Sequence, residues 1–144
     1  MDVSDLRKRI IRALDDARKE VTVRRQAVDE AKVAYETFLE RVGGPLFKQA
    51  ATVLRGEGHD FTLHSPSGSV RLASDRSPLE FIEMELAVDN GQAQVIGRTS
   101  VLRGGRDPLI EETPLAPGKS VAQLSETDVT AFLVKEIPRL VHKH

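Results

Sequence analysis

The residues that could do chemistry in this 144-residue chain do not form a recognisable catalytic pattern. There is no cysteine, so disulfides, thiolate nucleophiles and zinc–thiolate sites are excluded. The sequence also lacks a phosphate-binding glycine loop, a dinucleotide-binding fingerprint, HExxH, an EF-hand loop and GxSxG. We therefore predict that the chain is not an enzyme and that it holds neither a cofactor nor a metal.

Histidine and serine are weak candidates for a chemical role. His59 and His64 are five residues apart on an expected strand, so their side chains should point to opposite faces and cannot form a metal pair. His142 and His144 lie in the terminal tail, where a metal site would lack rigid supporting ligands. The serine of Asp75-Arg76-Ser77 has no evident histidine as a base, which favours a turn over a nucleophile.

Arginines provide the main chemical alternative, which is the binding of anions or nucleic acid. Arg71 and Arg98 are expected to share one sheet face, while Arg103 and Arg106 flank a glycine turn, so their guanidinium groups could bind phosphate. Glutamates nearby and the scarcity of aromatic residues for base stacking weigh against this hypothesis. The formal charge of -1 adds no argument for nucleic acid or an anionic membrane.

The element expected to position these arginines is a β-hairpin over residues 79–102. Asn90-Gly91 suits a type I′ turn, because both central residues of that turn need a positive φ. This turn fixes the register and puts Glu83 opposite Arg98. One face then collects a matched apolar set, namely Ile82, Met84, Leu86 and Val88 against Thr99, Gly97, Val95 and Ala93.

Shorter elements are expected on either side of this hairpin. Residues 60–64 and 69–73 should form a first hairpin with His64 paired to Ser69, and residues 109–113 a weaker edge strand between two prolines. Consecutive hairpins imply an antiparallel meander of four to five strands. A last helix should begin at the N-cap Ser125 and be ended or kinked by Pro138.

The first part of the chain predicts one long helix. Residues 2–42 contain neither glycine nor proline, and Gly43-Gly44-Pro45 should end this helix and start a short second one over residues 45–55. Spacings of three and four alternate along its core-type positions, as in the heptads of a coiled coil. These positions are Leu14, Ala17, Val21, Arg24, Val28, Ala31, Tyr35, Phe38 and Val42.

The length of this helix predicts a partner. At 1.5 Å per residue, about 38 residues span roughly 57 Å, about twice the width of a small domain. Part of the apolar stripe must then extend beyond the domain, and a second copy is the simplest cover. The alternative is that the stripe packs on its own sheet while the overhang frays. The predicted partner-binding residues are Leu14, Val21, Arg24, Val28 and Tyr35.

These patterns together predict an α+β protein with two parts. Residues 1–42 form a projecting helix that binds a partner, and residues 43–144 combine a short helix, the meander and a C-terminal helix packed on the sheet. We predict a non-enzymatic interaction or scaffold module that forms a homo-oligomer, in first place a dimer, or binds a helical protein. Because no signal-peptide core or membrane-length apolar run is found, we expect it in the cytoplasm.

Overall fold

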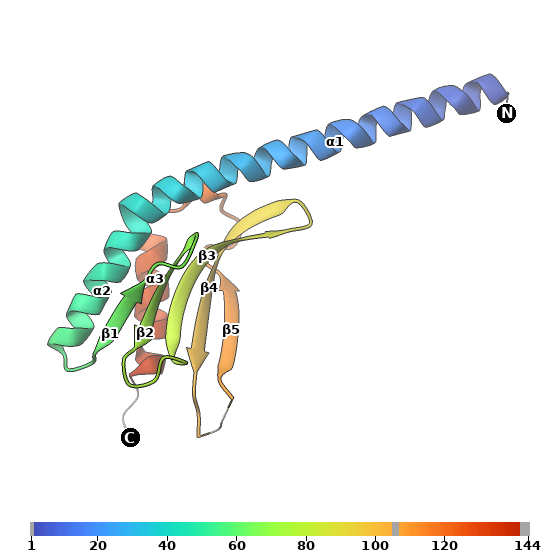
Figure 1. Ribbon diagram of the computed structural model, residues 1–144. Coiled ribbons are helices and arrows are strands. Elements are labelled where there is room, and N and C mark those ends of the chain that lie inside the picture. Colours follow the sequence, from blue (N-terminus) through green and yellow to red (C-terminus); the bar gives the residue numbers. More distant parts are fainter. Residues whose placement is uncertain (1, 105–106, 142–144) are drawn as a thin grey trace.

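The computed structural model describes residues 2–104 and 107–141, in which helices cover one face of a five-stranded antiparallel sheet (Figure 1). The strands follow the order β1-β2-β3-β4-β5, so the predicted α+β class and meander are confirmed. The elements are α1 (Val3–Phe38), α2 (Gly44–Gly56), β1 (Phe61–His64), β2 (Ser69–Ser74), β3 (Phe81–Asp89), β4 (Gln92–Val101), β5 (Leu109–Pro114) and α3 (Glu126–Leu140).

The first two helices form one continuous helical run, which corrects the predicted break at Gly43-Gly44-Pro45. A π-helical turn, Leu39–Gly43, joins α1 to α2, and the Gly44 amide donates to the Leu39 carbonyl. Both glycines have helical φ values of -63° and -58°, so neither is a left-handed cap. The wider turn tolerates Pro45, which has no N–H to donate. Gly43 instead leaves room for the Met84 methyl group, which a Cβ at this position would overlap.

The central hairpin is formed as predicted. Asn90 and Gly91 have φ values of 50° and 73°, as a type I′ turn requires. Glu83 pairs with Arg98 across β3 and β4. The two faces of the sheet are therefore those that the sequence pattern indicates.

The first hairpin has a different register from the predicted one. His64 pairs with Arg71 rather than with Ser69, a shift of two residues. The Ser69 amide donates to the Pro66 carbonyl at 2.9 Å, which closes the turn before the two strands begin to pair. A shift of two residues keeps every side chain on its predicted face, so the apolar pattern alone could not detect it.

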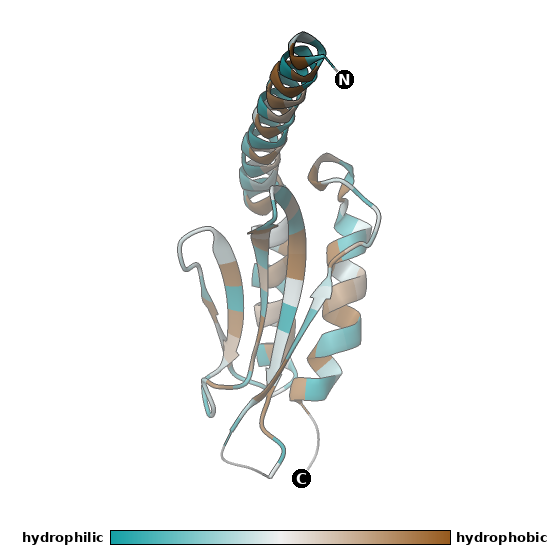
Figure 2. Cartoon of the chain, turned by 90° about the vertical axis from the view of Figure 1, so that its right-hand side faces the viewer, coloured by the Kyte–Doolittle hydropathy of each residue, from teal (hydrophilic) through white to brown (hydrophobic). Residues whose placement is uncertain are grey.

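One core joins the helices to the inner face of the sheet. Leu72, Ile82 and Met84 of the sheet are fully buried, with Phe47 from α2 and Val129 from α3. Tyr35 and Phe38 of α1 belong to the same core, whereas no residue of α1 before Val28 is even partly buried. The C-terminal part of α1 is thus an integral layer of the domain, and the rest of α1 projects from it (Figures 1 and 2).

The C-terminal helix begins at the predicted N-cap. Ser125 and Asp128 form a capping box, and the Asp128 carboxylate also accepts from Lys119 at 3.0 Å. Pro138 lies inside the last turn, and α3 ends two residues later at Leu140. Burial by itself raises the pKa of Asp128, but hydrogen bonds from Ser125 and the Lys119 ammonium lower this pKa overall.

Replacing Asp128 by Asn should destabilise the protein at pH 7 and have little effect at low pH. Because the folded state lowers the pKa of this carboxyl, its contribution is full above the unfolded value of about 3.9 and is lost as the pH falls through the folded value. We expect a loss of about 1 kcal/mol at pH 7. Urea unfolding at pH 7 and near pH 2.5 measures this, with exposed Glu126→Gln in the same first turn as the control.

Candidate interaction surface

The projecting part of α1 is the largest unpacked element among the described residues. Residues 3–27 are all exposed and span roughly 37 Å of helix. This part carries large apolar residues that are exposed to solvent, and apolar residues recur as brown bands along the helix in Figure 2. They are Val3, Leu6, Ile10, Ile11, Leu14, Val21 and Val23, with exposed fractions between 46% and 81%.

Most of these side chains continue the face of α1 that packs on the sheet. We call Val3, Leu6, Ile10, Leu14, Ala17 and Val21 the apolar stripe. The same three-and-four spacing leads on to half-buried Val28 and Ala31 and then to buried Tyr35. The stripe and the core contacts therefore form one surface, of which only the C-terminal half is covered by this chain.

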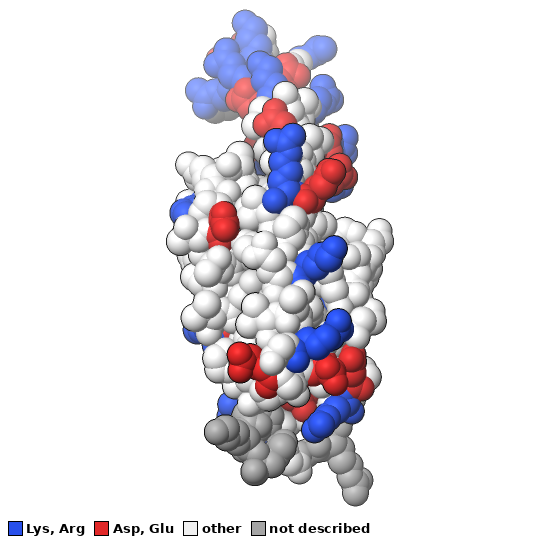
Figure 3. Space-filling view, turned by 90° about the vertical axis from the view of Figure 1, so that its left-hand side faces the viewer, with Lys and Arg blue, Asp and Glu red and all other residues white. Residues whose placement is uncertain are grey.

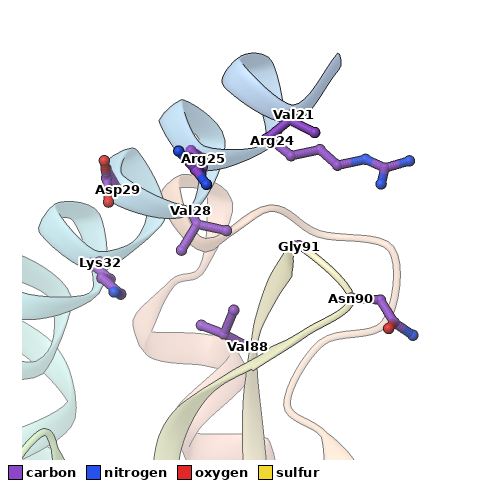
Figure 4. A pocket seen from close by; sticks show the side chains of 9 residues that line it. All are labelled: Val21, Arg24, Arg25, Val28, Asp29, Lys32, Val88, Asn90 and Gly91. Atoms are coloured by element: carbon purple, nitrogen blue, oxygen red, sulfur yellow. The ribbon is translucent and has the colours of Figure 1, made fainter. Parts of the chain in front are cut away.

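The boundary between the covered and uncovered halves lies at the tip of the β3–β4 hairpin. Residues of the tip and of α1 line a cavity of about 490 Å³, and Val28 and Val88 point toward each other across it (Figure 4). A Cβ on Gly91 would lie 3.2 Å from Cδ of Arg24, so the hairpin reaches the helix at this level. The Arg24 guanidinium is held away from the cavity by Glu20, at 2.6 Å.

The five predicted partner-binding residues thus have different surroundings. Leu14 and Val21 are about half exposed, at 50% and 46%, and Arg24 is exposed beside the hairpin tip. Val28 is half-buried against Val88. The prediction that Tyr35 binds a partner is wrong, because its side chain is only 3% exposed and offers no surface to a partner.

Tyr35 instead fixes α1 to the sheet. Its hydroxyl donates to the Met84 carbonyl at 3.2 Å. Burial raises the pKa of Tyr35, and the negative charges of Glu85 and Glu83 raise it further, so the hydroxyl remains a donor at any physiological pH. This hydrogen bond crosses from the helix layer to a central strand.

The predicted anion-binding arginines lie partly together, on the sheet face that the helices leave open. Arg71 and Arg98 meet at the buried carboxylate of Glu83, at 3.2 Å and 2.7 Å. Arg98 also binds Glu85 and Glu112, and the Arg71 guanidinium lies 4.0 Å from the centre of the Phe81 ring. Burial tends to lower the pKa of Arg98, but the hydrogen bonds to the three glutamates raise it overall.

These ion pairs leave little free positive charge on that face. Three carboxylates surround the two guanidinium groups, so an added anion would have to displace a glutamate. Arg103 is exposed in the β4–β5 connection, away from this cluster, and Arg106 lies outside the described residues. Anion or nucleic-acid binding by Arg71, Arg98, Arg103 and Arg106 stays a prediction.

A second apolar hollow, not anticipated from the sequence, lies between α2 and α3. It has a volume of about 410 Å³, and uncharged residues line it, including Leu46, Val53, Val134 and Ile137. Figure 3 looks onto the side where α2 lies and shows charged groups mainly on the projecting helix and near the opposite end. Val53 and Val134 are 64% and 68% exposed, so apolar side chains of both helices reach solvent at this hollow.

Metal sites and membrane-spanning helices were also sought among the described residues. In residues 2–104 and 107–141, no group of three or more His, Asp or Glu is placed to hold a metal ion. Within that same part of the chain, no helix combines the length and the apolar character needed to cross a membrane. His142 and His144 lie outside the described residues.

Comparisons with family models, curated proteins and solved structures found nothing that matches this chain. The surfaces of the chain itself are therefore the guide to its role. Of these, the apolar stripe is the longest among the described residues, and it continues the core contacts of α1.

Proposed function

We propose that this chain is a non-enzymatic scaffold or interaction module that forms a homodimer through the apolar stripe of α1. The observation that carries the proposal is the uninterrupted exposure of residues 3–27, which present a stripe of large aliphatic side chains to water. A helix of that length without tertiary contacts is only marginally stable in water. Pairing with a second stripe would stabilise the helix and bury its apolar face together.

The size of the stripe sets the expected strength of this association. Val3, Leu6, Ile10, Leu14 and Val21 are roughly half exposed or more. Burying what remains exposed is worth about 1 kcal/mol per side chain, or about 10 kcal/mol for the ten side chains of a pair. Association itself costs about 4–15 kcal/mol. The lower end of this cost leaves about 6 kcal/mol, so we expect a weak dimer with a dissociation constant of roughly 40 µM to 1 mM.

The test is a matched pair of substitutions on one helix. Val21 belongs to the stripe, whereas Val23 is 65% exposed and lies about 200° around the helix axis from Val21. Sedimentation velocity between about 1 and 500 µM should show a monomer–dimer equilibrium for the native chain. Val21→Glu should shift it at least about tenfold toward monomer, since a charge must then be buried, while Val23→Glu leaves it unchanged.

Two results would count against this function. A native chain that is still monomeric at the highest concentration would show that the stripe does not self-associate. Equal effects of Val21→Glu and Val23→Glu would show that the stripe face is not the contact.

The cytoplasm remains the expected compartment, a prediction that rests on the sequence alone.

A further inference from the structure

The geometry points to an antiparallel dimer, in which the start of α1 in one copy lies beside the hairpin tip of the other. This inference rests on the proposed self-association and specifies the arrangement of the two chains. It follows from where the domain lies relative to the stripe. The second copy proposed above is thereby given a defined orientation.

The hairpin tip blocks the stripe face at one end. Gly91 approaches the Arg24 side chain, and Val88 faces Val28, so this face is occupied by the chain's own domain from about residue 24 onward (Figures 1 and 4). The free part of the stripe runs from Val3 to Val21. A partner helix can use this face only between the start of α1 and the hairpin.

A parallel pair conflicts with this blockage. A twofold axis along the two helices would turn both stripes toward the axis. Both hairpins lie on that same face at the same level, so they would compete for the space beside the axis. In an antiparallel pair, each partner helix instead begins near the hairpin tip, and the two domains lie at opposite ends.

The heptad positions select one register. Extending the regular spacing from Leu14 back toward the start of α1 gives core-type positions 3, 7, 10, 14, 17, 21 and 24, so Leu6 lies one residue before position 7, at the edge of this seam. An antiparallel pair in which paired numbers sum to 24 matches Val3 with Val21, Arg7 with Ala17, and Ile10 with Leu14. Each Arg7 then meets a small residue and can extend to solvent.

The next register is disfavoured by charge and by space. Moving the helices by one heptad, to a sum of 31, would set Arg7 against Arg24 of the partner and create two like-charge contacts. It would also push Val3 to the level of Val28, where Val88 already lies. In the favoured register, the partner helix begins beside Val21, next to the cavity that Val28 and Val88 line.

Because the chain has no cysteine, disulfide trapping can test this orientation directly. Val3→Cys and Val21→Cys chains, one of them labelled with nitrogen-15 so that the two differ in mass, are mixed in the reduced state and then oxidised. Residues 3 and 21 are about 27 Å apart along one helix, far beyond the reach of a disulfide in a parallel pair. We expect the mixed Val3–Val21 disulfide to be the main cross-linked product.

Other outcomes separate this inference from the proposed function. A dimer by sedimentation that yields mainly Val3–Val3 and Val21–Val21 disulfides would overturn the antiparallel orientation and leave self-association intact. A dimer that yields no specific cross-link would overturn the register. A native chain that stays monomeric would overturn both. A mixture of Val3→Cys with Val23→Cys is the control and should give no more product than random collision does.

Discussion

Replacing Gly97 by Val should cost about 3 kcal/mol of folding stability, at the upper end of the range for overpacked cores. Gly97 lies in β4 opposite Met84, on the sheet face that α3 covers. A Cβ there would lie only 2.7 Å and 2.8 Å from Cζ and Cδ1 of Phe132. Phe132 is itself buried at 7% exposure, so its ring cannot move aside without displacing α3.

Whether Gly97→Val lowers or raises the folding stability distinguishes the packing clash with Phe132 from the preference of strands for valine. Valine is favoured over glycine in a strand interior, so without the Phe132 contact the substitution should stabilise β4. In a Phe132→Ala background the cost of Gly97→Val should therefore shrink by at least about 1 kcal/mol, as in a double-mutant cycle of touching residues. Chemical denaturation of the four chains measures this coupling.

Gly56 provides the control for this prediction. A Cβ at Gly56 would meet nothing within 4 Å, and the residue ends α2 without a positive φ. Gly56→Ala should leave stability unchanged or raise it slightly. A Gly97→Val chain as stable as the native one would show that α3 does not pack on β4 as described.

The sequence was sufficient to predict the elements whose boundaries depend on interactions between residues close in the chain. Asn90-Gly91 and the alternation around it fixed both the turn and the register of the central hairpin. Ser125 likewise marked the start of α3 through its own capping hydrogen bonds. In each case the decisive interactions join residues close in sequence, so no knowledge of the rest of the fold was required.

Contacts between distant elements account for what the sequence could not provide. Gly43 was predicted to end the first helix, but it lies within a continuous helical run, where its small size lets Met84 of β3 approach closely. Leu14 and Tyr35 have the same place in the heptad pattern, and only the position of the sheet exposes one and buries the other. The predicted stripe was therefore continuous, while the part of it that is free for a partner depends on where the hairpin tip meets α1.

The buried carboxylate of Glu83 should be the most sensitive charge in the protein, and Glu83→Gln should cost about 3 kcal/mol. Its side chain is 4% exposed and accepts hydrogen bonds from Arg71, Arg98 and Ser69. Removing the negative charge leaves two guanidinium groups beside a neutral amide in a partly buried site. The amide also presents N–H groups toward donors that need an acceptor.

Glu112→Gln is the matched control, because it makes the same chemical change in another glutamate that binds Arg98. The Glu112 side chain is 55% exposed and binds Nε of Arg98 at 2.9 Å. Solvent and salt screen such a contact, so its loss should cost less than about 1 kcal/mol. Urea unfolding of both variants at low and high salt measures the difference. Equal costs for the two variants would show that burial does not determine the strength of this cluster, and that the open sheet face is more hydrated than the structure indicates.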